Sequence, residues 1–145
     1  MESSALAKLF VLEAGTQALI RLMEEMSDGE KLFSSIAVVE VRSAIRRRQR
    51  AGDIQSLDAN AAIGSLIAES RRMVEQPVTP SVIENAQVLI DRHVLRALDA
   101  LQLATCIAAR ASLRGRDVCF VCSDQVLLRA ARAEQFEVLD PETMV

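Results

Sequence analysis

Short, unbroken apolar runs alternate along this chain with longer segments whose apolar residues recur at helical spacing. The clearest run covers residues 118–122, where every residue is apolar, as in a strand buried on both faces. Buried strands that alternate with helices are typical of parallel sheets with helices packed on their faces. The pattern therefore predicts an α/β protein.

The periodicity and the capping residues place the expected elements along the chain. Expected helices cover residues 3–13, 16–26, 36–50, 56–75, 80–93, from 98 or 99 to before 115, and from 123 or 124 to 134. Expected strands cover residues 32–34, 118–122 and 136–139. A serine would cap the first helix, Pro77 would stop the fourth, and Pro80 would open the fifth. No repeat or linker stands out, so residues 1–145 are expected to form a single domain.

Composition limits the environment and the function. Half of the residues are hydrophobic and the only aromatic residues are four Phe, so the core must be mainly aliphatic. A net charge of −3 argues against a nucleic-acid coating role, but less against a nuclease, whose bound cations reverse the local charge. No apolar run is long enough to span a membrane, and no secretory signal is visible. With three cysteines, an odd number, a reducing cytoplasmic location is expected.

Three acidic residues stand in apolar surroundings where a core is expected. Glu40 lies inside the predicted helix 36–50, Asp99 has apolar neighbours on both sides, and Asp124 closely follows the predicted strand 118–122. In parallel α/β sheets, ligands bind at the carboxyl ends of the strands. These carboxylates are therefore candidate functional groups.

Each of these acids also has a structural explanation. Asp99 and Asp124 could cap their helices, because a carboxylate accepts hydrogen bonds from free backbone N–H groups and complements the helix dipole. Glu40 lies a full turn or more inside its helix, so its structural explanation is an ion pair with Arg96 or Arg42.

Convergence of the acids would require a cation. Two carboxylates about 5 Å apart repel by roughly 3 kcal/mol at an effective dielectric of 20. Ligation by oxygen alone selects hard ions such as Mg²⁺ or Mn²⁺. Such ions chiefly serve phosphoryl chemistry, so convergence would indicate a phosphate or phosphodiester substrate.

Four segments carry these acids and their neighbours in a fixed order. They are residues 3–10 (SSALAKLF), 34–44 (SSIAVVEVRSA), 95–104 (LRALDALQLA) and 120–127 (FVCSDQVL). Together they resemble, in order and spacing, the motifs of VapC-like PIN domains, the ribonuclease toxins of bacterial toxin–antitoxin pairs. The resemblance covers essentially the whole chain.

The resemblance implies a three-layer α/β/α fold around a central, mostly parallel sheet of four to five strands. It also implies a metal-dependent endoribonuclease whose pocket of four acids binds one or two Mg²⁺ or Mn²⁺ ions. Carried over by position, the catalytic and metal-binding acids are Glu2, Glu40, Asp99 and Asp124. The supporting residues are Ser4, Ser123 and Arg96. A metal-activated water would cleave RNA to leave a 5′-phosphate and a 3′-hydroxyl.

The sequence departs from the family pattern at two places. The first acid is usually Asp and follows a short strand, whereas here Glu2 follows Met1 directly. We therefore expect the first strand to be truncated, which would leave a gap in the middle of the sheet. Cys122 occupies a position where relatives often carry Ser or Thr, and a thiol is a weaker hydrogen-bond partner than a hydroxyl.

Besides the four acids, the arginines near residue 50, the single histidine and two cysteines also bear on function. Arg46, Arg47 and Arg50 either form a solvated helix end or contact RNA or an acidic partner segment. The single histidine, His93, is expected at a helix end rather than in catalysis. Cys119 and Cys122 are three apart in a strand and so point to opposite faces, which argues against a metal pair.

The family also suggests partners and competing functions. VapC-like proteins usually form homodimers and bind a VapB-like antitoxin peptide, so both partners are expected besides RNA. The alternative is a catalytically compromised PIN-like module that binds an antitoxin or RNA without cleaving, which the position of Glu2 motivates. A generic Mg²⁺-dependent phosphatase has less support, because no Asp-x-Asp pair occurs.

Overall fold

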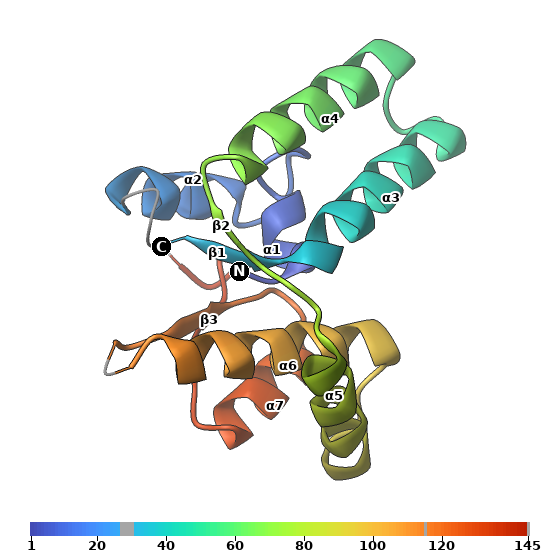
Figure 1. Ribbon diagram of the computed structural model, residues 1–145. Helices are drawn as coiled ribbons and strands as arrows, with labels where there is room; N and C mark the ends of the chain where they lie inside the picture. The colour runs from blue at the N-terminus through green and yellow to red at the C-terminus, as the bar shows by residue number, and fades with distance from the viewer. Residues whose placement is uncertain (27–30, 115, 145) are drawn as a thin grey trace.

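A computed structural model describes residues 1–26, 31–114 and 116–144 (Figure 1). The described helices are α1 (Ser3–Ala7), α2 (Thr16–Glu25), α3 (Ser35–Ala51), α4 (Ser56–Ser70), α5 (Pro80–Arg92), α6 (Ala97–Ser112) and α7 (Gln125–Ala133). The described strands are β1 (Leu32–Ser34), β2 (Val74–Gln76), β3 (Cys119–Val121) and β4 (Glu137–Leu139). A pair of helices precedes each of the first three strands, and α7 alone separates β3 from β4, so helices connect the successive strands as in an α/β fold.

The described strands form two separate parallel ladders. β1 pairs with β2, with Leu32 opposite Val74, and β3 pairs with β4, with Cys119 opposite Glu137. The parallel pairing is confirmed, whereas a single sheet of four to five strands is not, because no described strand joins β1 to β3.

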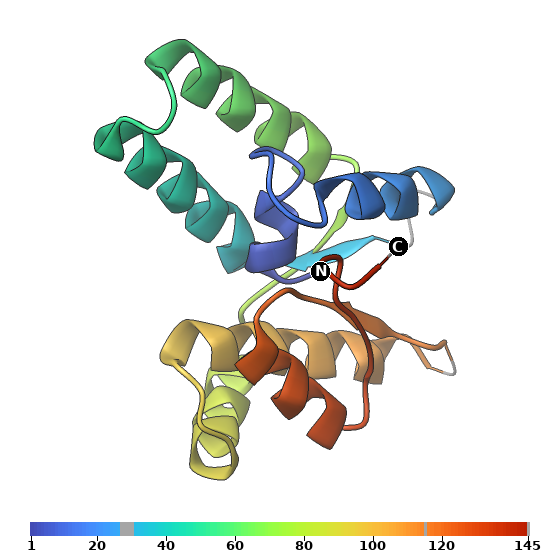
Figure 2. The same ribbon diagram turned by 180° about the vertical axis from the view of Figure 1, so that it is seen from behind.

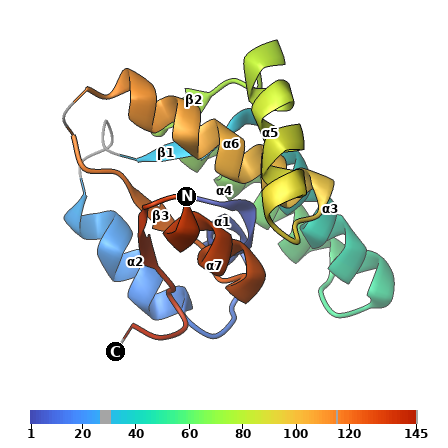
Figure 3. The ribbon, with the colours of Figure 1, turned by 90° about the horizontal axis from the view of Figure 1, so that it is seen from below.

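A cavity of about 670 Å³ separates the facing edges of β1 and β3. Met1 and Glu2 connect the two ladders beside this space (Figure 3): the Met1 amino group donates to Leu32 O at 2.7 Å. The Glu2 N–H donates to Val121 O at 2.9 Å, so these two residues bond to both strands as a middle strand would.

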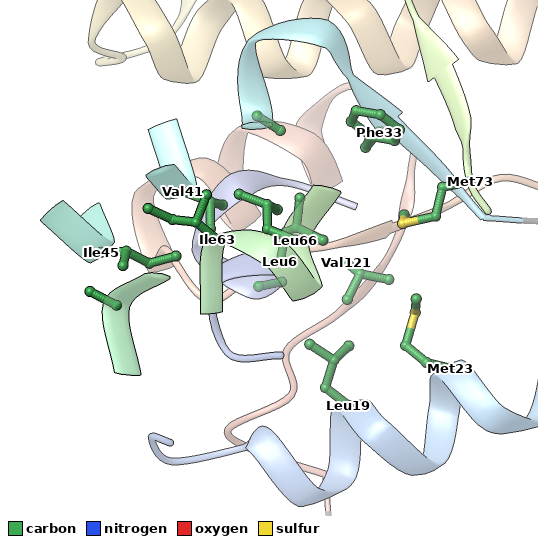
Figure 4. Close-up of a cluster of buried hydrophobic side chains, with 13 residues drawn as sticks. Leu6, Leu19, Met23, Phe33, Val41, Ile45, Ile63, Leu66, Met73 and Val121 are labelled. Carbon is green, nitrogen blue, oxygen red and sulfur yellow. The ribbon is translucent and has the colours of Figure 1, made fainter. Parts of the chain in front are cut away.

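Two hydrophobic clusters hold the helices on the two sides of the ladders. The first joins α1–α4 to β1, with Leu6, Leu19 and Leu66 among its fully buried side chains (Figure 4). The second joins α5–α7 to β3, with Leu103 and Leu127 completely covered. Figure 2 shows these groups on opposite sides of the strands, in the layered arrangement of an α/β/α fold.

The α3–α4 hairpin projects from the rest of the molecule as an arm (Figure 1). Ile45 of α3 and Ala59 of α4 are both fully buried between the two helices. Arg46 adds a hydrogen bond to Asn60 at 2.9 Å. α3 ends at Gly52, whose φ of 87° is the left-handed conformation that glycine adopts at helix ends.

Several expected boundaries are corrected by the structure. The first helix is much shorter than residues 3–13, and its N-cap is Glu2 rather than a serine. The helix expected over residues 56–75 ends at Ser70, and β2 follows it. That strand escapes sequence analysis because it has three residues and is held by pairing with the distant β1. The helix starts at Pro80 and after Asp124 are confirmed.

Within the described ranges, none of the helices is both long and apolar enough to cross a membrane.

Candidate active site

The four candidate acids lie at the carboxyl ends of β1 and β3 or on helices beside them. Asp124 follows β3 and caps α7, and Glu2 is bonded through its backbone to the last residue of β3. Glu40 belongs to α3, which starts directly after β1, and Asp99 lies in the first turn of α6. A buried hydrogen bond between the hydroxyls of Ser34 and Thr105, 3.2 Å long, fixes α6 against the end of β1.

Glu2 is a buried carboxylate surrounded by hydrogen-bond donors. Its side chain caps α1 by accepting a hydrogen bond from the Ser4 N–H at 2.8 Å. The hydroxyls of Ser3 and Ser4 donate to its two oxygens, and the Cys122 thiol donates to Oε2 at 3.4 Å. Only 4% of Glu2 is exposed, so these donors replace the water that its charge would otherwise need.

Glu40 is held by a glutamine rather than by an arginine. Its Oε2 accepts a hydrogen bond from Gln102 Nε2 at 2.6 Å. The described ion pairs do not include one between Glu40 and Arg96 or Arg42, which was the structural explanation left open by the sequence. Burial raises the pKa of Glu40 above its ordinary value, and the negative charges of Glu2 and Asp99 raise it further. The carboxylate of Glu40 is therefore close enough to Glu2 and Asp99 for their charges to act on it, although the three residues are far apart in the sequence.

Asp99 and Asp124 share one arginine. Arg96 Nε donates to Asp99 Oδ2 at 2.8 Å, and its Nη2 lies 3.6 Å from Asp124 Oδ2. The hydrogen bond and charge of Asp99, and to a smaller degree the charges of Asp124 and Glu2, raise the pKa of Arg96. The acids that sequence analysis singled out thus share one local electrostatic environment.

The helix-capping explanation holds for one of the two aspartates. Asp124 Oδ1 accepts hydrogen bonds from the N–H groups of Val126 and Leu127 at 2.8 and 3.0 Å, so it is the N-cap of α7. Asp99 is not a cap, because Arg96 occupies the N-cap position of α6. Capping accounts for one oxygen of Asp124 and leaves Oδ2 free to face a cation.

Ser4 and Ser123 connect the first and last motifs. The Ser123 N–H donates to the Ser4 hydroxyl at 3.0 Å, while that hydroxyl donates to Glu2. The Ser123 hydroxyl is buried and has no hydrogen-bond partner among the described groups. An unpaired buried hydroxyl beside an acid cluster is a donor group that a ligand could satisfy.

Sequence analysis missed two side chains that belong to this environment. Gln102 donates to Glu40, and the sequence signal for it was an amide in the apolar segment one helical turn after Asp99. Cys122 was noted only as a departure, but it is fully buried and bonds Glu2 and the Asp124 N–H. Burial, followed by the charge of Glu2, raises the pKa of Cys122 far above its ordinary value, so the thiol stays neutral.

The acid cluster offers oxygen ligands for a divalent ion, but they are dispersed. No three His, Cys, Asp or Glu side chains in the described part of the chain are gathered closely enough to hold a metal ion. The oxygens of Glu2 face serine hydroxyls, and the Oδ2 atoms of Asp99 and Asp124 face Arg96. The chemistry nevertheless fits Mg²⁺ or Mn²⁺, because the cluster offers carboxylate oxygens and an unpaired buried hydroxyl.

The basic residues at the end of α3 lie on the projecting arm. Arg47 and Arg50 are exposed, whereas Arg46 bonds Gln49 and Asn60 and stabilises the hairpin. His93 ends α5 and bonds Glu134 at 2.8 Å, which places it at a helix end as expected.

Sequence comparison identifies one family. Residues 2–135 match the PIN domain family, a range that contains all four acids and the serines beside them. No curated protein matches the sequence.

Proposed function

This chain belongs to the PIN domain family, whose members are generally metal-dependent nucleases, and on that basis we propose that it is a Mg²⁺- or Mn²⁺-dependent endoribonuclease. The observation that carries the proposal is the set of contacts that joins the four acids at the ends of β1 and β3. Arg96 contacts both Asp99 and Asp124. The Ser4 hydroxyl links Glu2 to Ser123, the neighbour of Asp124. The charges of Glu2 and Asp99 also raise the pKa of Glu40. Carboxylates from four distant segments that lie in one region, with Arg96 as the cation that contacts two of them, are consistent with a site for a divalent ion.

The four acids are the residues that would hold the ion. When bound, it would neutralise charge on the phosphodiester and activate the attacking water. The chain's own residues prepare this site: Gln102 orients Glu40 through Oε2, and Cys122 and Ser4 orient Glu2. Ser123, the neighbour of Asp124, adds a buried hydroxyl that has no hydrogen-bond partner among the described groups.

The finer biological role is also a proposal. The motifs resemble those of VapC-like toxins, so we assign the chain the role of toxin in a toxin–antitoxin pair, acting as a cytoplasmic homodimer of one domain, residues 1–145. The exposed Arg47 and Arg50, with Arg46 behind them, would bind RNA phosphates or an acidic segment of a VapB-like antitoxin.

The experiment is cleavage of a mixture of transfer and ribosomal RNA by the full chain with Mn²⁺ or Mg²⁺. Asp99→Asn should reduce cleavage by at least about 100-fold, because it removes one carboxylate from the acid cluster that catalysis needs. Asp91→Asn is the matched control, since Asp91 is an exposed acid of α5. Equal cleavage by the wild type and Asp99→Asn, or none by either across several RNAs, would contradict the proposal.

A second candidate function is binding without cleavage. It is favoured by one observation, namely that no described group of three acids is arranged around a common ion position. This candidate predicts no gain in thermal stability with Mn²⁺, whereas a metal-binding site gains stability once the ion exceeds its Kd. Retained antitoxin binding with no metal effect would favour it over the nuclease.

A further inference from the structure

Arg96 is the described cation closest to the acid cluster. It occupies the N-cap position of α6 but makes no side-chain capping bond there. Its guanidinium instead bridges Asp99, one turn into α6, and Asp124 at the start of α7. Two acids from different motifs are therefore tied together by one positive group.

Arg96 faces an oxygen of Asp124 that is available for a metal ion, and one of the two oxygens of Asp99. Asp124 uses Oδ1 for the N–H groups of α7 and turns Oδ2 toward the arginine. Asp99 likewise presents Oδ2. A divalent ion bound by Asp124 would need Oδ2, because Oδ1 is used by α7. An ion held between Asp124 and Asp99 would also lie against the positive guanidinium, so the ion and Arg96 compete for this position.

The contacts of Arg96 with the two aspartates are weak enough for its side chain to move away from them. Its side chain is 80% exposed, whereas those of Asp99 and Asp124 are only 15% and 30% exposed. One N–H contacts Asp99 at 2.8 Å and the approach to Asp124 is 3.6 Å, so neither carboxylate receives a paired, two-bond contact. Exposed ion pairs of this kind contribute little, and departure of the arginine would open no cavity.

We infer that Arg96 is a built-in counter-cation, which screens Asp99 and Asp124 in the metal-free protein and is displaced by the divalent ion. Once displaced, its charge lies at the edge of the site, where it can pair with a phosphate of the substrate. This role rests on the proposed function, because it requires the two aspartates to be metal ligands.

The first test measures the Mn²⁺ affinity of the full chain by calorimetry. Arg96→Gln removes the competing cation, so it should bind Mn²⁺ about three- to tenfold more tightly than the wild type. Arg92→Gln is the matched control, because Arg92 is an exposed arginine paired with Glu134 outside the cluster. Its affinity should equal that of the wild type, and Asp99→Asn should lose binding.

The second test observes Arg96 directly in the wild-type protein by NMR during titration with Mg²⁺. The Nε–H signal of Arg96, identified by its absence in Arg96→Gln, should shift at the Mg²⁺ concentrations that fill the site. The corresponding signal of Arg92 should not shift. An Arg96 signal unchanged at saturating Mg²⁺ would overturn the inference without relying on a variant.

Different results would contradict the role of Arg96 and the metal site itself. If Asp99→Asn loses Mn²⁺ binding while Arg96→Gln binds it no more tightly than the wild type, the role of Arg96 is wrong and the metal site stands. If neither the wild type nor Arg96→Gln binds Mn²⁺ or Mg²⁺, the proposed metal site is wrong and the role of Arg96 falls with it.

Discussion

At the scale of the residue, Glu40 shows that bringing acids together in a partly buried place destabilises their charged form. Its carboxylate is partly buried and lies near two other acids, and Gln102 donates a hydrogen bond to it. Sequence alone identified Glu40 as a misplaced acid, because an acid inside an apolar helix needs an explanation. It could not identify Gln102 as the partner, because that contact depends on how α3 and α6 pack.

Replacing Glu40 by glutamine should stabilise the protein near neutral pH. Burial raises the pKa of folded Glu40, so the folded state binds its proton more tightly than the unfolded state does. The stabilising contribution of the protonated group is complete below the unfolded pKa of about 4.3 and is lost as pH rises through the folded pKa. Glu40→Gln should therefore gain of the order of 1 kcal/mol at pH 7 and little at pH 3 to 4.

Chemical denaturation across this pH range measures the effect. Glu84→Gln, which changes an exposed acid of α5, serves as the control and should change the free energy of unfolding by less than about 0.5 kcal/mol. A Glu40→Gln protein less stable than the wild type at pH 7 would mean that the carboxylate is favourably paired rather than repelled.

At the scale of elements, the sequence predicted what local signals control and missed what distant contacts control. The helix starts at Pro80 and after Asp124 were predictable because proline and a capping acid act locally. β2 was not predictable, since its three residues are ordered by pairing with β1. The short α1 was also missed, because apolar residues after Ala7 pack against the core without continuing the helix.

Gly15 illustrates a junction between elements that only glycine can make. It precedes α2 with a φ of 82°, and a Cβ added there would lie 2.6 Å from the carbonyl carbon of Pro141. Gly52 has a similar φ of 87° but open space around it. Gly15→Ala should therefore cost about 3 kcal/mol or more, and Gly52→Ala about 1 to 2 kcal/mol.

Thermal unfolding of the two alanine variants isolates the steric contribution, because both share the strained backbone conformation. Equal losses of stability would show that the backbone near Pro141 moves away and that the close approach is not required.

At the scale of the whole molecule, the layers follow from the sequence pattern but the sheet does not close. Buried apolar strands correctly predicted parallel pairing, and the helices cover both sides. Among the described residues no strand joins β1 to β3, and a cavity lined by Met1 and by both strands lies between them.

The amino group of Met1 should make stability depend on pH. Its burial lowers its pKa, so the folded state favours the neutral amine. This contribution is complete above the unfolded pKa of about 8 and is lost as pH falls through the folded pKa. Acetylation removes the charge and keeps an N–H for Leu32 O, so it should stabilise the protein by about 1 kcal/mol at pH 6 and by less at pH 9.

Comparison of acetylated and free chains by thermal unfolding at the two pH values tests this expectation. A stability difference that does not change with pH would assign the effect to the added acetyl group rather than to the buried charge.

The most direct test of the central claim is the chemistry of the RNA ends that the protein produces. Hydrolysis by a metal-activated water at the four acids predicts fragments with a 5′-phosphate and a 3′-hydroxyl, formed with Mn²⁺ and abolished by EDTA or by Asp99→Asn. Fragments that end in a cyclic phosphate, or that form equally in EDTA, would show that cleavage does not depend on a metal held by Glu2, Glu40, Asp99 and Asp124.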